Sequence, residues 1–343
     1  MNAEDGGGPW VRIIVVNYNG GDFLQPCLDA LAGQTLRDFE VVVVDNDSTD
    51  DSIDNLRLPD ARFRLIRNAA NVGFAAANNI AVAGATSPWI ATLNPDTVAR
   101  PAWLAGMRTG TTRHPGVGMF GATLVRADNP EIVDGFGDVL SISGIPWRGG
   151  GGAPVAALPG SDIEVFAPCA AAALYRRECF ERAGGFDESF FCYVEDVDLG
   201  FRLRLAGERC VQLRDAIVLH HASALTGLTS AFTLYHSYRN RLWVLFKNLP
   251  LALLVVSVPV NLLASALIIL RQGAGGAPVR AAFKGLWRGL VRGPAVRRRA
   301  PARRGRRIST LAIARTLDWN PLHLIRCSVV ALGTAAPSSR DGT

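Results

Sequence analysis

VRIIVVNYNG (Val11–Gly20) and FEVVVVDNDSTDDS (Phe39–Ser52) decide the fold of this chain. Within them, Val11–Val16 and Glu40–Val44 are short, unbroken β-branched runs that end in polar residues, which is typical of strands buried on both faces of a parallel sheet. Between the two runs, Asp22 is placed to cap a helix that continues to about Gln34. The two stretches therefore predict a β-α-β unit.

The same alternation continues along the chain. Arg64–Arg67 and Trp89–Leu93 are further predicted strands, and Phe74–Ala83 is a predicted helix between them. We expect an element order βαβαβαβ, which specifies a doubly wound sheet. Ligands of such sheets bind beyond the carboxyl ends of the strands. Polar segments follow three of the strands at that edge, namely Asn17–Gly20, Asp45–Asp47 and Asn94–Asp96.

A second informative stretch is GGFDESFFCYVEDVDLGFRLRLAG (Gly184–Gly207). Its apolar residues recur at helical spacing, and three carboxylates, Glu195, Asp196 and Asp198, lie in the first predicted turn. At about 100° per residue, Glu195 and Asp198 share a face while Asp196 points elsewhere. Taken alone, acidic residues at a helix start are explained by the helix dipole. The alternative is that one carboxylate faces a ligand while the others hold the helix start.

Charge is divided unevenly along the 343 residues. The net charge is +6, yet 12 of the 36 basic residues and no acidic residue lie between Arg271 and Arg307. The sequence thus predicts a mildly acidic body with a basic C-terminal arm. No aromatic pattern suited to reading bases interleaves with these arginines, so a nucleic-acid partner is not expected. The six cysteines show no CxxC spacing and are predicted to be reduced thiols.

The basic arm follows an uncharged segment of 22 residues, LPLALLVVSVPVNLLASALIIL (Leu249–Leu270). A helix of this length is about 33 Å long, which is close to the thickness of a bilayer core. Pro259 is expected to kink it, and Ala281–Val291 resembles an interfacial helix with Lys284 and Arg288 on its polar side. A single span would place the arm on the far side of the membrane, so a monotopic or re-entrant anchor is favoured. A buried helix of a soluble domain is the alternative.

Together with NAANVGFAAANN (Asn68–Asn79) and WIATLNPDT (Trp89–Thr97), these motifs resemble glycosyltransferase family 2 from roughly Val11 to Asn248. Members are inverting nucleotide-sugar transferases, and the motifs look most like the rhamnosyltransferase branch. The resemblance implies the GT-A fold, an α/β fold with a doubly wound, mostly parallel sheet flanked by helices. We expect four regions: a disordered N-terminus (1–9), a catalytic domain (10–235), membrane-associating helices with the basic arm (236–310) and a C-terminal tail (311–343).

The resemblance also assigns donor-binding residues. Asp45 would hold the pyrimidine, with Asn17 and Asn46 nearby, although the same composition is typical of a turn. The other residues expected on the donor side are Asn71, Gly73, Asn78, Asn94 and Arg239. A guanidinium suits a diphosphate, but Arg239 is equally compatible with a lipid headgroup.

A divalent metal is expected on the donor diphosphate. Asp96 lies where the family has its DxD motif, and Asn94 replaces the first carboxylate. One carboxylate with phosphate oxygens and water suffices for Mg²⁺, and Mn²⁺ is the other candidate. By resemblance, His220 or His221 completes the metal ligands, and the sequence does not distinguish them.

Asp196 is the expected general base by its position in the motif. Glu195 and Asp198 are expected to orient the helix, to bind the acceptor, or, for Asp198, to pair with Arg202 four residues on. The glycine- and proline-rich stretch between Gly121 and Gly160 is expected to be an acceptor-side insertion or a mobile loop.

The sequence as a whole indicates an inverting glycosyltransferase of cell-envelope glycan synthesis. It would move L-rhamnose from dTDP-rhamnose to a lipid-linked or polysaccharide acceptor, at an anionic membrane surface on the cytoplasmic face. Two alternatives stay open. One is the same chemistry with a UDP-hexose donor, and the other is a non-catalytic, nucleotide-sugar-binding membrane scaffold.

Overall fold

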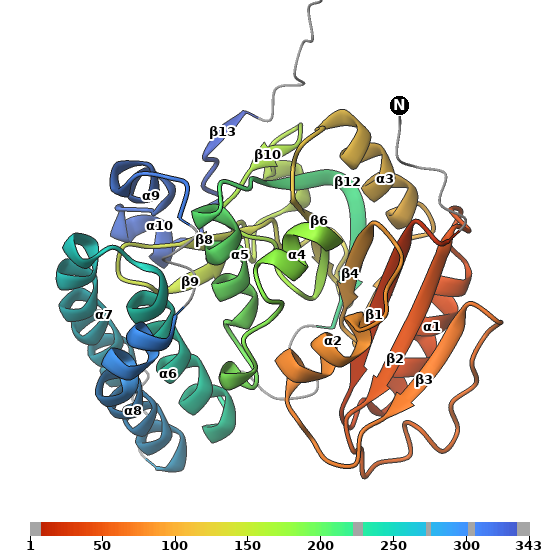
Figure 1. Ribbon diagram of the computed structural model, residues 1–343, viewed down its shortest axis with the longest axis horizontal. Coiled ribbons are helices and arrows are strands. Elements are labelled where there is room, and N and C mark those ends of the chain that lie inside the picture. Colours follow the sequence, from red (N-terminus) through yellow and green to blue (C-terminus); the bar gives the residue numbers. More distant parts are fainter. Residues whose placement is uncertain (1–7, 222–228, 272–275, 301–305, 335–343) are drawn as a thin grey trace, which may run out of the picture.

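The computed structural model describes residues 8–221, 229–271, 276–300 and 306–334. A central sheet carries helices on both faces, and a separate group of helices lies at one side (Figure 1). The strands are β1 (Val11–Asn17), β2 (Phe39–Asp45), β3 (Phe63–Arg67), β4 (Trp89–Leu93), β5 (Thr97–Ala99), β6 (Met119–Arg126), β7 (Val133–Gly135), β8 (Asp138–Leu140), β9 (Pro146–Arg148), β10 (Ile163–Glu164), β11 (Ala172–Arg176), β12 (Cys210–His220) and β13 (Gly333–Thr334). The α-helices are α1 (Leu24–Ala32), α2 (Phe74–Val82), α3 (Trp103–Arg113), α4 (Arg177–Arg182), α5 (Glu195–Leu205), α6 (Ala231–Asn248), α7 (Leu251–Arg271), α8 (Ala277–Arg299), α9 (Thr310–Thr316) and α10 (Pro321–Ile325).

The main sheet has the strand order β13-β10-β12-β6-β11-β4-β1-β2-β3. The strands β1, β2, β3 and β4 are mutually parallel, and β6 is parallel to β12. Only β11, which is antiparallel to both β4 and β6, reverses direction among the strands of five or more residues in the described chain. The predicted α/β class with a doubly wound, mostly parallel sheet is confirmed.

Alternate residues of the first strands enter two separate cores, as expected for a sheet covered on both faces. Ile13 and Val41 pack against α1 and α3 on one face. Ile14 and Val42 pack against α2, α4 and α5 on the other face. The unbroken apolar runs of the sequence are therefore explained by burial on both sides of the sheet.

One expected connection is absent from the described structure. The segment between β2 and β3 forms turns, so the expected βαβαβαβ order is wrong at this point. Polar side chains hold this segment in place of a helix: Asp50 accepts hydrogen bonds from the backbone N–H groups of Gly21 and Ser52. Such local side-chain bonds to the backbone compete with helix formation.

The helices α6, α7 and α8 form a third layer with its own apolar core. The expected boundary at 235/236 falls inside α6, which begins at Ala231. The residues expected to be a tail form α9, α10 and β13, and β13 pairs with β10. Among the described residues, α7 alone is long and apolar enough to cross a membrane, a test that a core helix of a soluble protein also passes.

A buried ionic cluster joins this helical layer to the α/β body that contains the main sheet. Asp198 in α5 is fully buried and accepts hydrogen bonds from Arg202 Nε (2.8 Å), Lys247 Nζ (2.7 Å) and Asn248 Nδ2 (2.8 Å). Lys247 also pairs with Asp187. Burial would raise the pKa of Asp198, but Lys247 and Arg202 outweigh burial and hold this pKa below its ordinary value. Of the roles expected for Asp198, the structure shows the pairing with Arg202.

Replacing Lys247 by Met is expected to lower the free energy of unfolding by about 3–5 kcal/mol, because buried Asp198 loses one of its two cations and Asp187 loses the cation with which it pairs. Urea unfolding followed by circular dichroism measures the change. Lys284→Met removes an exposed lysine and should leave the midpoint nearly unchanged. Equal effects of the two substitutions would contradict a structural role for the buried cluster.

Candidate active site

The polar residues predicted at the strand ends do meet at one edge of the sheet. Asn17 and Asp45 end β1 and β2 and are partners in the parallel register of these strands. Asn17 Nδ2 donates to the hydroxyls of Ser48 (3.0 Å) and Ser52 (2.9 Å). Its Oδ1 is buried without a hydrogen-bond partner, which leaves one acceptor available at this edge.

Asn46 organises the loop beside Asp45. Its Nδ2 donates to Asn71 Oδ1 (2.8 Å), and its Oδ1 accepts from Asn68 Nδ2 (3.0 Å) and from the backbone N–H of Val72 (3.1 Å). Asn46 and Asn71 therefore hold this loop through hydrogen bonds to protein groups. These bonds fix the loop that follows Asp45, the last residue of β2.

Gly73 directly precedes α2, and Asn78 lies within this helix. Gly73 has φ +87°, and a Cβ atom there would lie 2.6 Å from Phe191, so only glycine fits. Asn78 is buried; its Nδ2 donates to Phe74 O (2.9 Å), while its Oδ1 has no partner. Through Gly73 the predicted donor-side motif is in direct contact with the turn that precedes α5.

That turn is held in an unusual backbone conformation. Phe191, Tyr193 and Val194 all have φ between 66° and 69°, a region that non-glycine residues seldom adopt. Asn240 of α6 is fully buried, and its Nδ2 donates to the carbonyl oxygens of Phe190, Cys192 and Tyr193. A strained turn of this kind persists only where the surroundings impose it.

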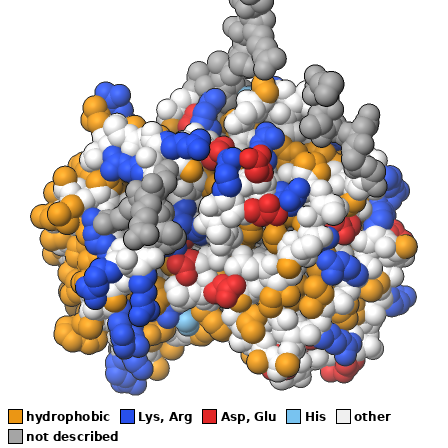
Figure 2. Space-filling model, viewed as in Figure 1, with side chains coloured by type: hydrophobic (Ala, Val, Ile, Leu, Met, Phe, Trp, Pro, Cys, Tyr) orange, Lys and Arg blue, Asp and Glu red, His pale blue; other side chains and the backbone are white. Residues whose placement is uncertain are grey.

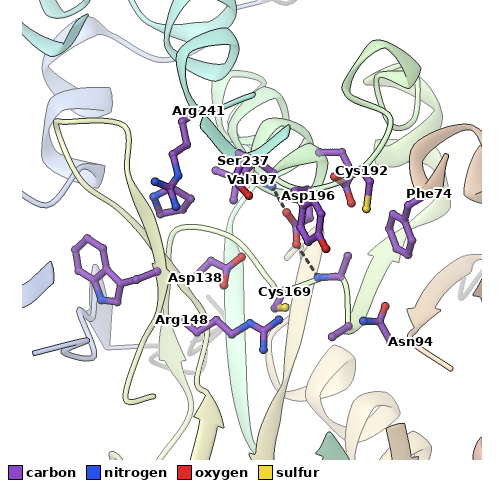
Figure 3. Close-up of a pocket in the computed structure, with 17 residues that line it drawn as sticks. Phe74, Asn94, Asp138, Arg148, Cys169, Cys192, Asp196, Val197, Ser237 and Arg241 are labelled. Carbon is purple, nitrogen blue, oxygen red and sulfur yellow. Dashed lines mark hydrogen bonds between the residues drawn. The ribbon is translucent and has the colours of Figure 1, made fainter. Parts of the chain in front are cut away.

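Immediately after the turn, Asp196 faces a cavity of about 340 Å³ (Figure 3). Its Oδ2 accepts from the backbone N–H of Ala170 (3.0 Å) and its Oδ1 from that of Val197 (2.8 Å). Burial raises the pKa of Asp196, although both backbone hydrogen bonds and Arg148 oppose the shift. A fixed carboxylate with a raised pKa and a free lone pair on each oxygen is suited to accept a proton.

The two neighbouring acidic residues have different surroundings. Glu195 also lines the cavity and is buried, and its Oε2 has no hydrogen-bond partner. Burial and the charge of Asp196 raise the pKa of Glu195 well above its ordinary value. Asp198 is engaged with Arg202, Lys247 and Asn248 and does not line the cavity. The three adjacent carboxylates thus separate into Asp196 and Glu195 at the cavity and Asp198 in the ionic cluster.

Asp96 and His220 form a second polar centre. Asp96 Oδ1 and His220 Nε2 lie 3.4 Å apart, both are buried, and neither has a hydrogen-bond partner. A buried oxygen and nitrogen left open toward each other are suited to share a divalent cation, for which carboxylate and imidazole are common ligands. The residues present therefore fit a metal.

Asp134 of β7 orients this histidine. Asp134 Oδ2 lies 2.8 Å from His220 Nδ1, which directs the other ring nitrogen, Nε2, toward Asp96. Such carboxylate–histidine pairs fix the tautomer of metal-binding histidines. His221 is different: it is exposed, its ring lies 4.8 Å from that of Phe23, and it contacts Asp96 only through its backbone N–H. The structure thus distinguishes two histidines that the sequence does not.

The β8–β9 hairpin contributes residues that the sequence analysis missed. Asp138, Trp147 and Arg148 line the cavity from β8 and β9, in the stretch expected to be a loop. Arg148 donates to Asp134 Oδ2 and lies beside Asp138 and Cys169 (Figure 3). Burial opposes the charge of Arg148, but the surrounding Cys169, Asp134, Asp138 and Asp196 raise its pKa. The sequence signal that could have indicated these cavity residues is the pair Trp147-Arg148 at the start of a glycine-rich stretch.

Arg239 is not a cavity residue. Its guanidinium donates to Asn240 Oδ1 (2.8 Å) and to Phe190 O (2.8 Å), and its Cζ lies 4.3 Å from the centre of the Trp243 ring. Arg241, two residues later in α6, lines the cavity instead, and its Nε has no hydrogen-bond partner. The contacts of Arg239 support the strained turn. Asn94, which was expected on the donor side, lines the cavity.

Comparison with known proteins agrees with this arrangement. Residues 12–131 match the family model of glycosyl transferase family 2. The N-acetylglucosaminyl-diphospho-decaprenol L-rhamnosyltransferase of Mycobacterium tuberculosis is 30% identical over 248 residues, which cover 63% of this chain and 77% of that protein. The O-antigen biosynthesis protein RfbC of Myxococcus xanthus is 32% identical over 64% of this chain, and the aligned region is 18% of RfbC. The chain likewise spans only a quarter of the uncharacterized protein y4gI of Sinorhizobium fredii, at 31% identity.

Two solved structures share the fold. One is the mannosyltransferase PcManGT of Pyrobaculum calidifontis in complex with GDP-Man and Mn²⁺, with a TM-score of 0.54 at 20% identity. The match covers 93% of this chain and 86% of the PcManGT chain. The other is GalNAc-T7 with UDP, GalNAc and Mn²⁺, with a TM-score of 0.57 at 15% identity. This match covers 71% of this chain and 48% of the GalNAc-T7 chain. The fold, the family model and the mycobacterial relative agree: the chain is a glycosyltransferase and belongs to glycosyltransferase family 2.

Proposed function

We propose that this enzyme is an inverting transferase that moves L-rhamnose from dTDP-L-rhamnose to a lipid-linked acceptor at the cytoplasmic face of the membrane. The choice of sugar and acceptor is supported by the mycobacterial relative, whose name states an L-rhamnosyl transfer involving N-acetylglucosaminyl-diphospho-decaprenol. The solved neighbours are complexes with nucleotides or nucleotide sugars and Mn²⁺, in keeping with a metal-assisted nucleotide-sugar site.

The observation that carries the proposal is the placement of Asp196 in the cavity, held by two backbone N–H groups that fix its carboxylate. An acceptor hydroxyl in this cavity would attack the anomeric carbon on the face opposite the diphosphate. The new C–O bond forms as the bond to the diphosphate breaks, and Asp196 takes the hydroxyl proton. One displacement inverts the anomeric centre and needs no covalent intermediate.

Charge compensation is the second requirement. Asp96 and His220 would hold a divalent cation, and such a cation would offset the charge of the diphosphate leaving group. Arg148 and Arg241 add positive charge to the cavity wall. Asp45, with the acceptor oxygen of Asn17 beside it, would hold the pyrimidine at the adjacent strand ends.

Donor identity is tested by release of nucleoside diphosphate from the purified, detergent-solubilised chain. We expect turnover of dTDP-rhamnose in preference to UDP-galactose, UDP-glucose and UDP-N-acetylglucosamine, with Mg²⁺ or Mn²⁺ present and not with chelator. Turnover of a UDP-hexose and not of dTDP-rhamnose would show that the proposed donor is wrong and that the UDP-hexose is the donor. Binding of donor without turnover of any of the four would favour the non-catalytic, nucleotide-sugar-binding scaffold, and absence of both turnover and binding would contradict the proposal.

Asp196→Asn is expected to lower kcat by about 10²–10⁴-fold, because proton transfer to a positioned base contributes about that much. Donor affinity, measured by calorimetry, should be unchanged because the carboxylate faces the acceptor hydroxyl. Asp215→Asn, at an exposed position of β12, is the matched control and should retain activity. An active Asp196→Asn enzyme would refute the role of Asp196 as the base.

Metal binding should separate the two histidines. Mn²⁺ bound in the presence of nucleoside diphosphate, followed by electron paramagnetic resonance, should be lost in His220→Ala and retained in His221→Ala. Asp134→Asn is expected to weaken Mn²⁺ binding by about 10–100-fold, because it removes the partner that orients His220. The reverse result, with His221 required and His220 dispensable, would contradict the assignment.

A further inference from the structure

The helix α7 has its polar residues inside and its apolar residues outside. Its buried face consists of Leu254, Ser257, Asn261, Ser265 and Ile269. Its exposed face consists of large aliphatic residues along the whole length: Leu251, Val255, Val256, Val260, Leu263, Leu267 and Leu270. Leu263, near the middle, is 64% exposed, while Asn261 two residues earlier is fully buried.

This is the reverse of a helix on the surface of a water-soluble protein, which turns its apolar stripe toward the core. The aliphatic side chains form a band at the edge of the molecule where α7 lies (Figure 2). A continuous exposed apolar band of this kind marks a protein or membrane contact. The next helix indicates which of the two.

The outward side of α8 combines apolar and basic rows. Phe283, Trp287 and Val291 are exposed, and Trp287 is 67% exposed. A second row consists of basic residues spaced one helical turn apart, namely Arg280, Lys284, Arg288 and Arg292. All four are exposed, and α8 contains no acidic residue. Basic side chains gather beside the hydrophobic edge of the molecule, on the side where α7 and α8 lie (Figures 1 and 2). Aliphatic and aromatic residues flanked by cations fit the acyl chains and phosphates of an anionic bilayer.

The orientation of α8 is fixed by close packing. Gly285, Gly289 and Gly293 face α6, and a Cβ atom at these positions would lie 2.4 Å from Tyr235 O, 2.9 Å from Leu242 and 2.1 Å from Phe246 respectively. Only glycine allows this approach of two helix backbones. The apolar and basic rows are therefore presented as a rigid part of the catalytic body.

The contacts of α7 oppose a transmembrane arrangement. At the middle of the helix, Asn261 Nδ2 donates to Ser143 O (2.7 Å), in the turn of the β8–β9 hairpin. The buried stripe from Leu254 to Ile269 extends over about 22 Å of helix, at 1.5 Å per residue. If α7 crossed a bilayer core about 30 Å thick, this hairpin turn and the cationic row of α8 would be drawn into hydrocarbon. The Lys and Arg side chains of that row would be costly at this depth.

We propose that α7 and α8 form an in-plane docking surface for an anionic lipid bilayer, with the outer face of α7 immersed among the acyl chains and the basic row of α8 at the phosphates. The hairpin that contacts α7 through Ser143 also carries Asp138, Trp147 and Arg148 into the cavity. The membrane surface is thereby joined to the acceptor side of the site. Only this last consequence rests on the proposed function, because docking itself requires no sugar transfer.

Vesicle flotation of the full chain tests docking without measuring transfer. We expect binding to phosphatidylcholine vesicles that increases strongly with phosphatidylglycerol content and decreases with salt. The double substitution Leu263→Gln/Leu267→Gln should weaken binding about tenfold or more, because it removes apolar area from the lipid contact. Leu58→Gln, at an exposed leucine between β2 and β3 at the opposite end of the molecule, should bind like the unaltered protein.

Depth measurements distinguish lying on the membrane from crossing it. A fluorophore on a cysteine introduced at Val255, Leu263 or Leu270 is quenched by nitroxide lipids labelled near the headgroup or deep in the acyl chain, with the unaltered protein as blank. In-plane docking predicts the same shallow depth at all three positions. A deep Leu263 between two shallow ends would establish a span and overturn the proposal.

Two further results would also overturn it. One is the absence of vesicle binding by the unaltered protein. The other is a dimer, detected by sedimentation velocity, that Leu263→Gln/Leu267→Gln dissociates, which would assign the apolar band to a second copy of the chain. Because none of these measurements depends on a sugar donor, they are separable from a failure of the proposed transferase activity.

Discussion

The position of the proposed base depends on the turn between Phe190 and α5. Its residues Phe191, Tyr193 and Val194 have left-handed backbone conformations, each of which costs roughly 1–3 kcal/mol. Asn240 holds the turn through three carbonyl oxygens, and Arg239 adds a hydrogen bond to Phe190 O. Without these contacts from α6, the first turn of α5 would have no fixed direction, and the Asp196 carboxylate would have no fixed place in the cavity.

The same turn couples otherwise distant parts of the site. Gly73, at the start of α2, packs directly on Phe191, so the donor-side loop and the turn constrain each other. Lys247 of α6 pairs with Asp187, which precedes the turn, and with Asp198 of α5, which follows it. The helical layer, which carries the apolar and basic surface, is therefore also the support of the active site. This explains why α6 contains several buried charged and amide side chains, whose partners are all in the catalytic body or in α6 itself.

Much of the fold followed from local sequence because burial on both faces of a parallel strand leaves an unbroken apolar run. β1, β2 and β4 were predicted within a residue or two, and the polar ends of these strands were predicted to lie together because parallel strands end at the same edge. The region from β6 to β9 was not predicted as strands. Its strands are short, its turns contain glycine and proline, and its pairing is decided by partners far along the chain, such as β6 with β12.

The sequence by itself determined the α/β class and the polar residues at the strand ends, and it proposed Asp196, Asp96 and one of two histidines as site residues. Only the tertiary structure decided which neighbour in each pair faces the site: His220 and not His221, Arg241 and not Arg239. It also brought Asp134 and Arg148 to the site and turned the polar stripe of α7 inward. The physical reason is that side-chain direction at the end of a strand or along a helix is set by packing against distant segments, which local residue patterns do not encode.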